Sequence, residues 1–281
     1  MKYLDLFELG KKIEIMDIGA AAINEIPIYT NLISNKIGNL NAFEGDERQI
    51  EKLKLKYKES IKLFTEFLFD GSEQDLYLAA PESGMTSLFK PNKKVLNFFN
   101  HFSHIGKISE IKKIQTSKLN DIEKLPPIDF AKLDIQGSEL TVLKNGNLKL
   151  KKCLAIQVEV SYVCLYENQP TFGEIDLWMR ENAYIPHRFM DIKRWSIAPT
   201  LFNNNPRVPG NQLLESDIIY IKDPFKAEFL DEEQLKKLIL LSHYCFQSYD
   251  LSVFFILELE KRNILEKDTF KNYIANIKKF S

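Results

Sequence analysis

The feature that most constrains the fold is an alternation of short apolar runs with helix-like segments through about the first 180 residues of the 281-residue chain. Runs such as IEIMDI (13–18) and CLAIQVEV (153–160) are nearly continuous in apolar residues, as is typical of strands buried on both faces. Between such runs, apolar residues recur at helical spacing, as in DERQIEKLKLKYKES (46–60). The alternation predicts an α/β fold with a mostly parallel sheet and helices on both of its faces.

The end of the chain departs from this alternation. Two predicted strands, YIPHRF (184–189) and DIIYIKD (217–223), are separated only by a loop, which predicts a closing antiparallel hairpin. Residues 231–281 carry apolar residues at helical spacing and predict two or three helices. We therefore expect an α/β domain over residues 1–225 and a helical extension over residues 226–281, which either caps the domain or forms a homodimer.

Composition excludes several classes of protein. The 38 Lys and Arg residues against 39 Asp and Glu give a net charge of -1, so no global basic field is present to hold nucleic acid. Three widely spaced cysteines do not make a disulfide framework, which favours a reducing compartment. No run approaches the roughly 18 consecutive apolar residues of a membrane helix, and the first residues lack the apolar core of a signal peptide. We expect a cytoplasmic protein without a membrane span.

The first two predicted strands both end on acids. Asp17 and Gly19 lie at the end of the first strand, and Glu44 ends the second. Ligands of open α/β sheets bind beyond the carboxyl ends of the strands, and an acid there accepts hydrogen bonds from both hydroxyls of a ribose. A glycine lets the backbone pass close to a ligand. This pair of strand ends predicts a nucleoside-containing cofactor.

The loop after the first strand narrows the identity of that cofactor. Gly19 is followed by Ala20 and two further alanines, so the pattern is not G-x-G-x-x-G. A pyrophosphate requires close backbone approach at the second glycine, which disfavours a dinucleotide and a nicotinamide-dependent oxidoreductase. S-adenosylmethionine has no phosphate and tolerates a looser loop.

Three further acids are candidates for the chemistry. Asp134 ends the strand in FAKLDIQGSEL, beside the position where the order of the sheet is expected to reverse, and is a candidate general base, metal ligand or hydrogen-bond partner. Glu139 either stabilises the first turn of the following helix or belongs to the site. Glu159 interrupts an apolar strand, and because a buried glutamate costs several kcal/mol unless it is paired, we expect it to face the crevice.

The remaining candidates lie near the predicted substrate side. The four histidines are scattered, and no histidine or cysteine cluster completes a zinc site, but His187 falls in YIPHRFMD, close to that side. Arg194 and Trp195 fall in the polar segment MDIKRWSIAPTLFNNNPRVPG, which we interpret as a loop. They predict either a platform for a sugar with contacts to anions or a mobile surface lid.

The segments DFAKLDIQGSELTVLKNG and IQVEVSYVCLYENQPTFGEIDLWMRENAY resemble the FkbM family of S-adenosylmethionine-dependent methyltransferases. MDIGA, FEGD, TSKLNDI and NQLLESDIIYIKD follow the order of that family. The resemblance covers roughly residues 13–223. It implies a class I methyltransferase sheet of seven strands with the last antiparallel. It also implies methyl transfer to a hydroxyl oxygen, often on a sugar, a glycan or a related natural product.

The resemblance also implies roles for individual residues. Asp17, Gly19 and Ala20 line the methionine side of S-adenosylmethionine, and Glu44 binds its ribose. The turn at Asp70 and Gly71 falls near the adenine. Asp134 lies closest to the reacting atoms as the base or as one ligand of a divalent ion, with Glu159 and Glu139 as further members of such a site.

An alternative rests on one departure from the family pattern. Many members have a G-A-N-x-G loop where this chain has GAAAINE (19–25). A chain that kept the sheet and lost cofactor binding is expected to act as a non-catalytic partner or scaffold in glycan biosynthesis.

Overall fold

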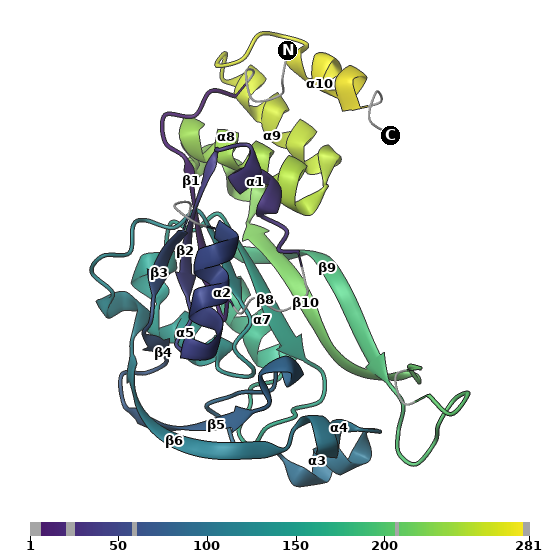
Figure 1. The fold of residues 1–281 in the computed structure, drawn as a ribbon. Helices are drawn as coiled ribbons and strands as arrows, with labels where there is room; N and C mark the ends of the chain where they lie inside the picture. The colour runs from purple at the N-terminus through teal and green to yellow at the C-terminus, as the bar shows by residue number, and fades with distance from the viewer. Residues whose placement is uncertain (1–6, 21–25, 58–60, 206–207, 278–281) are drawn as a thin grey trace.

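The computed structural model describes residues 7–20, 26–57, 61–205 and 208–277 (Figure 1). Its centre is a seven-stranded sheet with the order β3-β2-β1-β7-β8-β10-β9. These strands are β1 (Ile13–Ile18), β2 (Gly38–Phe43), β3 (Ile61–Phe64), β7 (Phe130–Leu133), β8 (Ala155–Ser161), β9 (Tyr184–Trp195) and β10 (Gln212–Lys222). All neighbouring strands from β3 to β8 pair in parallel, whereas β10 pairs antiparallel with both β8 and β9. The predicted α/β sheet with a closing antiparallel hairpin is confirmed.

The apolar run IKLFTEFLFD (61–70) predicts a single third strand, and this prediction is wrong. The structure divides it into β3 and a two-residue strand, β4 (Phe67–Leu68). β4 belongs to a separate three-stranded sheet, β4-β6-β5, formed with β5 (Glu73–Ala79) and β6 (Ile108–Ser117). The break is not visible in the sequence because both short strands are apolar. β3 pairs with β2, whereas β4 pairs with β6.

Helices cover both faces of the large sheet, as the alternation predicts. One face packs against α5 (Glu139–Asn145), α6 (Asn147–Leu150) and α7 (Phe172–Glu181). The other packs against α1 (Thr30–Ser34), Leu53 of α2 (Glu47–Tyr57) and the C-terminal helices. Along β1, Ile13 and Ile15 belong to the second face, and Met16 and Ile18 belong to the first. Burial on both faces explains why the strand is a continuous apolar run.

The predicted helical extension comprises α8 (Glu232–Leu241), the π-helical segment η6 (Ser242–Phe246), α9 (Tyr249–Lys261) and α10 (Thr269–Ile277). These helices stack at the amino ends of the parallel strands (Figure 1). Phe246 packs on Phe130 of β7, with ring centroids 5.9 Å apart, and both belong to one hydrophobic core. The extension therefore caps a face of its own sheet.

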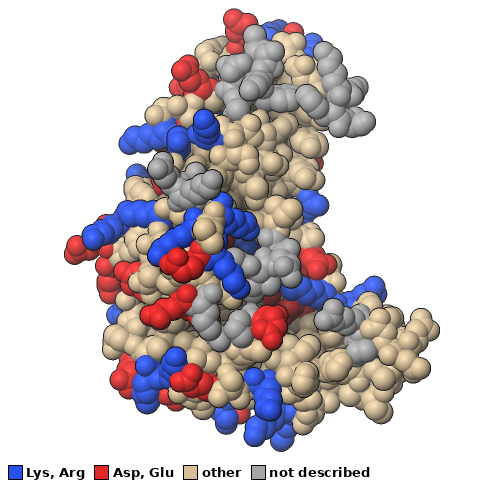
Figure 2. Space-filling model, in the orientation of Figure 1, with Lys and Arg blue, Asp and Glu red and all other residues tan. Residues whose placement is uncertain are grey.

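A third apolar cluster lies at the other end of the molecule. It joins α3 (Lys93–Phe98) and α4 (Phe102–Ile105), which sequence analysis did not predict, to the carboxyl end of β9. Trp195 packs edge-on against Phe102, with ring centroids 5.0 Å apart, and its indole nitrogen donates to the carbonyl of Asn100 at 2.8 Å. On the face drawn in Figure 2, Lys and Arg side chains are interspersed with Asp and Glu. Among the described helices, none has the length and hydropathy needed to cross a bilayer.

Candidate active site

One face of the large sheet changes from apolar to charged along its strands. On β1, Asp17 follows Ile15, and on β7, Lys132 follows Phe130. Side chains two residues apart point to the same face of a strand, so these polar groups continue the apolar rows that the C-terminal helices cover. The other strands place Gln157, Glu159, Glu215, Asp217 and Lys193 on this polar half.

The polar half opens into a cavity of ≈ 670 Å³ at the carboxyl ends of the parallel strands. Leu68 and Leu76 of the small sheet and residues 83–88 close it on the opposite side. β1 and β7 are neighbours in the sheet although β2 and β3 lie between them in sequence, so the strand order reverses there. Asp134, directly after β7, lines the cavity at that switch point, which is the usual ligand position in open α/β sheets.

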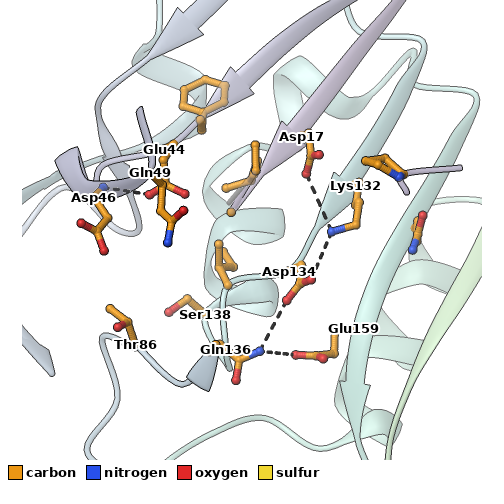
Figure 3. Close-up of a pocket in the computed structure, with 18 of the residues that line it drawn as sticks. Asp17, Glu44, Asp46, Gln49, Thr86, Lys132, Asp134, Gln136, Ser138 and Glu159 are labelled. Atoms are coloured by element: carbon orange, nitrogen blue, oxygen red, sulfur yellow. Dashed lines mark hydrogen bonds and ion pairs between the residues drawn. The ribbon is translucent and has the colours of Figure 1, made fainter. Parts of the chain in front are cut away.

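Lys132 connects the acids of the two strands that meet at the switch point (Figure 3). Its Nζ lies 3.1 Å from Oδ2 of Asp134 and 3.9 Å from Oδ1 of Asp17. Burial is the largest influence on the pKa of Asp134 and raises it, but the ion pair and hydrogen bond with Lys132, the charge of Lys193 and the Gln136 amide together leave that pKa below its ordinary value. Burial raises the pKa of Asp17, although Lys132 and a hydrogen bond donated by the Tyr29 hydroxyl oppose the rise. Asp134 is therefore held as a carboxylate.

Gln136 joins Asp134 to Glu159. Its Nε2 donates to Oε2 of Glu159 at 2.9 Å and to Oδ1 of Asp134 at 3.4 Å, and its Oε1 accepts from the Tyr166 hydroxyl at 2.9 Å. Burial, and then the nearby carboxylates of Glu215 and Asp134, raise the pKa of Glu159 well above 4.5. Glu159 faces the cavity, as expected, in an environment that favours its protonated form.

Sequence analysis missed the polar groups that the closing hairpin contributes. Lys193 of β9 places its Nζ 2.8 Å from Oε1 of Glu215 and 3.8 Å from Oε1 of Glu159. Asp217 of β10 lies opposite Glu159 in the register, and its buried Oδ1 makes no hydrogen bond to any residue that the structure describes. Burial, followed by the charge of Asp134, raises the pKa of Asp217 to about 6. The available signal was that Asp217 begins the predicted strand DIIYIKD (217–223), because the first half of an antiparallel strand lies beside the carboxyl ends of the parallel strands.

Glu44 lies across the cavity from these groups, beside Asp46 and Gln49 (Figure 3). Its side chain is buried, and Oε1 accepts a hydrogen bond from the backbone nitrogen of Asp46 at 2.8 Å. This bond orients the carboxylate at the end of β2.

Gly19 and Ala20 also line the cavity. Gly19 has a φ of +80°, and a Cβ built on it lies 2.0 Å from the carbonyl oxygen of Asp134. The glycine is therefore required by the close approach of the segments that follow β1 and β7, whatever ligand passes over it.

Three predicted residues do not line the cavity. Oε1 of Glu139 accepts hydrogen bonds from the backbone nitrogens of Ile135 at 2.9 Å and Gly137 at 3.2 Å, so this side chain shapes the turn between β7 and α5. Burial raises its pKa to about 7 despite these bonds. Asp70 accepts hydrogen bonds from the backbone nitrogen and hydroxyl of Ser72, next to Gly71 with its φ of +87°. The Asp70–Gly71 turn thus satisfies its own polar groups outside the described lining of the cavity.

The structure also does not bring the three predicted substrate residues to the cavity. The interpretation of residues 190–195 as part of a loop is wrong, because β9 extends to Trp195, whereas residues 196–205 lie outside the helices and named strands. Half-buried His187 packs 6.3 Å from the ring of Phe246, Arg194 is exposed, and Trp195 belongs to the third apolar cluster. Side chains along this strand alternate between the two faces of the sheet, and Lys193 is the one that lines the cavity instead.

The predicted metal pair, Asp134 and Glu159, is bridged by the amide of Gln136. Within the described part of the chain, no three His, Cys, Asp or Glu side chains are placed to hold a metal ion. Lys132 and Lys193 instead neutralise the carboxylates by ion pairing. The described residues therefore do not form a metal site.

Several solved structures are similar to this chain at low identity. A methyltransferase described as putative from Thermoplasma acidophilum is 11% identical, with a TM-score of 0.40 over 76% of this chain and 70% of that chain. Precorrin-6y C5,15-methyltransferase from Geobacter metallireducens is 13% identical, with a TM-score of 0.38 over 78% and 85% of the two chains. Identities this low say nothing about a shared substrate.

Comparison of sequences is more informative about the family than comparison of structures. No curated protein sequence matches the chain significantly. The sequence profile described as "Methyltransferase FkbM domain" matches residues 17–186, which is more than half of the chain and spans β1 to the start of β9. The chain therefore belongs to the FkbM methyltransferase family.

Proposed function

We propose that the protein is an S-adenosylmethionine-dependent methyltransferase that methylates a hydroxyl oxygen of a sugar, glycan or related natural product. The observation that carries this proposal is one cavity, at the switch point of the sheet, with Glu44 on one side and Asp17 and Asp134 on the other. A volume of ≈ 670 Å³ lies within the usual range for small-molecule sites. Family membership supports methyl transfer as the reaction.

The strand ends suggest how the cofactor lies. Glu44 accepts hydrogen bonds from the ribose hydroxyls, and the methionine half crosses Gly19 and Ala20 toward Asp134. When bound, S-adenosylmethionine supplies an electrophilic methyl group on a positively charged sulfur. The carboxyl groups of Asp17 and Asp134 both line this part of the cavity beside Lys132, and a carboxylate there favours a sulfonium.

The protein's own contribution is alignment and exclusion of water. The sequence makes Asp134 a candidate base, but its ion pair with Lys132 and its lowered pKa favour a binding role. The protonated form of Glu159 favours donation of a hydrogen bond to the acceptor. Ser83, Thr86 and Ser87 also line the cavity, and a polar lining of this kind suits a polyhydroxylated acceptor.

The non-catalytic alternative depends on residues 21–25, which lie outside the described residues. The cytoplasmic location and the homodimer stay predictions. Leu238 of α8 and Phe255 of α9 pack in the core that includes the sheet, whereas Phe254 and Leu257 of α9 are exposed.

Calorimetric titration with S-adenosylmethionine tests the proposal. We expect saturable binding to the wild-type protein and a dissociation constant raised by roughly tenfold or more in Glu44→Ala, because charge-assisted hydrogen bonds are lost. Glu181→Ala, an exposed acid on α7, is the matched control and should bind normally. Absence of binding to folded wild-type protein would overturn the proposal, and normal binding by Glu44→Ala would remove Glu44 from the ribose site.

A further inference from the structure

We propose that Asp217, on the reversed strand β10, is the proton acceptor for the hydroxyl group that is methylated. This inference rests on the proposed function and adds a catalytic residue that lies outside the region matched by the family profile, residues 17–186. Its basis is the position of Asp217 in the cavity, the engagement of the neighbouring acids, and the unsatisfied oxygen of its side chain.

The position follows from the order of strands across the sheet. This part of the sheet has the order β2-β1-β7-β8-β10. Glu44 follows β2 and Gly19 follows β1. Asp134 follows β7, Glu159 lies on β8, and Asp217 lies on β10. A cofactor with its ribose at Glu44 and its methionine half across β1 directs its reactive end toward β7 and the strands beyond it. Asp217 therefore lies on the side that is left for the acceptor.

The other acids on that side already have partners. Asp134 pairs with Lys132, Glu215 pairs with Lys193, and Glu159 accepts from Gln136. Oδ1 of Asp217 is buried and has no hydrogen-bond partner among the described residues, although the Gln157 side chain lies close enough to the carboxyl group to lower its pKa.

A second buried polar atom without a hydrogen-bond partner supports the assignment of Asp217 as the proton acceptor. Oε1 of Gln157 lines the cavity on β8 and, like Oδ1 of Asp217, is buried without a hydrogen-bond partner among the described residues. The Gln157 side chain is only 4% exposed. Buried acceptors of this kind are costly unless a donor reaches them, and a hydroxyl-bearing ligand supplies such donors.

The charges around Asp217 suit a base that works near neutral pH. Burial, followed by the charge of Asp134, raises its pKa to about 6, so it is ionised above that pH and still binds a proton better than an ordinary aspartate. The titratable and charged groups that face it from the neighbouring strands are Lys132, Asp134, Glu159, Asp191, Lys193 and Glu215.

The step balances without a further reactant. A lone pair of the acceptor oxygen forms a bond to the methyl carbon as the carbon–sulfur bond breaks, and that bond's electron pair returns to sulfur, giving a neutral thioether. The proton on the acceptor oxygen passes to Oδ1 of Asp217 and later to solvent. The products are a methyl ether, S-adenosylhomocysteine and a proton.

A test that needs no acceptor compares two ligands by calorimetry. S-adenosylhomocysteine lacks the methyl group, whereas sinefungin has a carbon bearing a protonated amine in place of the methylated sulfur. That amine projects toward the proton acceptor. At pH 7.5 we expect sinefungin to bind wild-type protein roughly tenfold or more tightly than S-adenosylhomocysteine, and Asp217→Asn to lose that preference while its S-adenosylhomocysteine affinity changes less than about twofold.

Two further variants complete the comparison. Glu159→Gln tests the competing assignment to the neighbouring acid, and we expect it to keep the preference because Glu159 is favoured in its neutral form. Asp75→Asn, at an exposed surface pair with Lys113, should retain it as well. Loss of the preference in Glu159→Gln but not in Asp217→Asn would assign the proton acceptor to Glu159 and overturn the proposal.

The wild-type protein gives an independent measurement if Asp217→Asn does not fold. The sinefungin preference should fall as the pH is lowered from 7.5 to 5, because Asp217 becomes neutral through about pH 6. A preference that is absent at pH 7.5, or that is constant over this range, overturns the role of Asp217. Failure of S-adenosylhomocysteine to bind wild-type protein instead overturns the proposed cofactor site itself.

Discussion

Gly19 shows how one backbone position joins fold and site. Its φ of +80° and the 2.0 Å separation between a built Cβ and the Asp134 carbonyl oxygen exclude any side chain there. We expect Gly19→Ala to lower the free energy of unfolding by roughly 2–4 kcal/mol, since backbone strain and overpacking act together. Chemical denaturation measures this loss. Gly84→Ala is the matched control, because Gly84 has a φ of +68° but no atom within 4 Å of a built Cβ. Equal losses in the two variants would show that the contact with Asp134 contributes nothing.

The connection between β7 and α5 is held by Glu139, whose carboxylate accepts two backbone hydrogen bonds within the turn. Burial raises its pKa from 4.5 to about 7, so the folded protein binds this proton more tightly than the unfolded chain does. That stabilisation is complete below about pH 4.5 and is lost as the pH rises through about 7. We expect wild-type stability to fall by on the order of 2–3 kcal/mol more than that of Glu139→Gln between pH 5 and pH 7.5. Urea denaturation at the two pH values measures it, and identical pH dependence in both proteins would contradict the assignment.

Across the whole molecule, the C-terminal helices and the sheet share one apolar core, and a buried ion pair ties them together. Nζ of Lys237 on α8 lies 2.8 Å from Oδ2 of Asp129, which also accepts from the backbone nitrogen of Glu14 at 2.8 Å. We expect Lys237→Met, which keeps the apolar stem, to cost about 3 kcal/mol in the free energy of unfolding, because largely buried Asp129 loses its counter-ion. The domain boundary at residue 225 stays a prediction. The chain changes there from strands to helices, but the helices and the sheet share one apolar core.

The neighbouring lysine provides the control for that measurement. Lys236 pairs with Glu232, whose side chain is half exposed, so Lys236→Met should cost less than about 1 kcal/mol. Thermal or urea unfolding of the two variants compares them directly. Similar losses would mean that the Lys237–Asp129 pair does not couple the helices to the sheet.

Prediction from sequence succeeded where neighbours along the chain decide the outcome. β1 occupies the predicted residues 13–18, and Asp134 and Glu159 both reach the cavity because acids at the carboxyl ends of parallel strands meet at one edge. It failed where a segment's partner lies far away in sequence. Residues 61–70 separate into two sheets, and Arg194 and Trp195 belong to a strand because β10 pairs with the whole length of that segment.

Apolar periodicity and acids at strand ends were sufficient to predict the α/β class, the antiparallel hairpin and Glu44, because short stretches of chain determine burial patterns and strand ends. Only the tertiary structure decided which side chains share the cavity and which of them can exchange a proton. Lys193 and Asp217 reach it because β10 inserts between β8 and β9, which places the start of a reversed strand beside the ends of the parallel ones. The protonation of Asp134, Glu159 and Asp217 depends on burial and on the distances to Lys132 and Lys193, and these distances arise only when strands distant in sequence pack together.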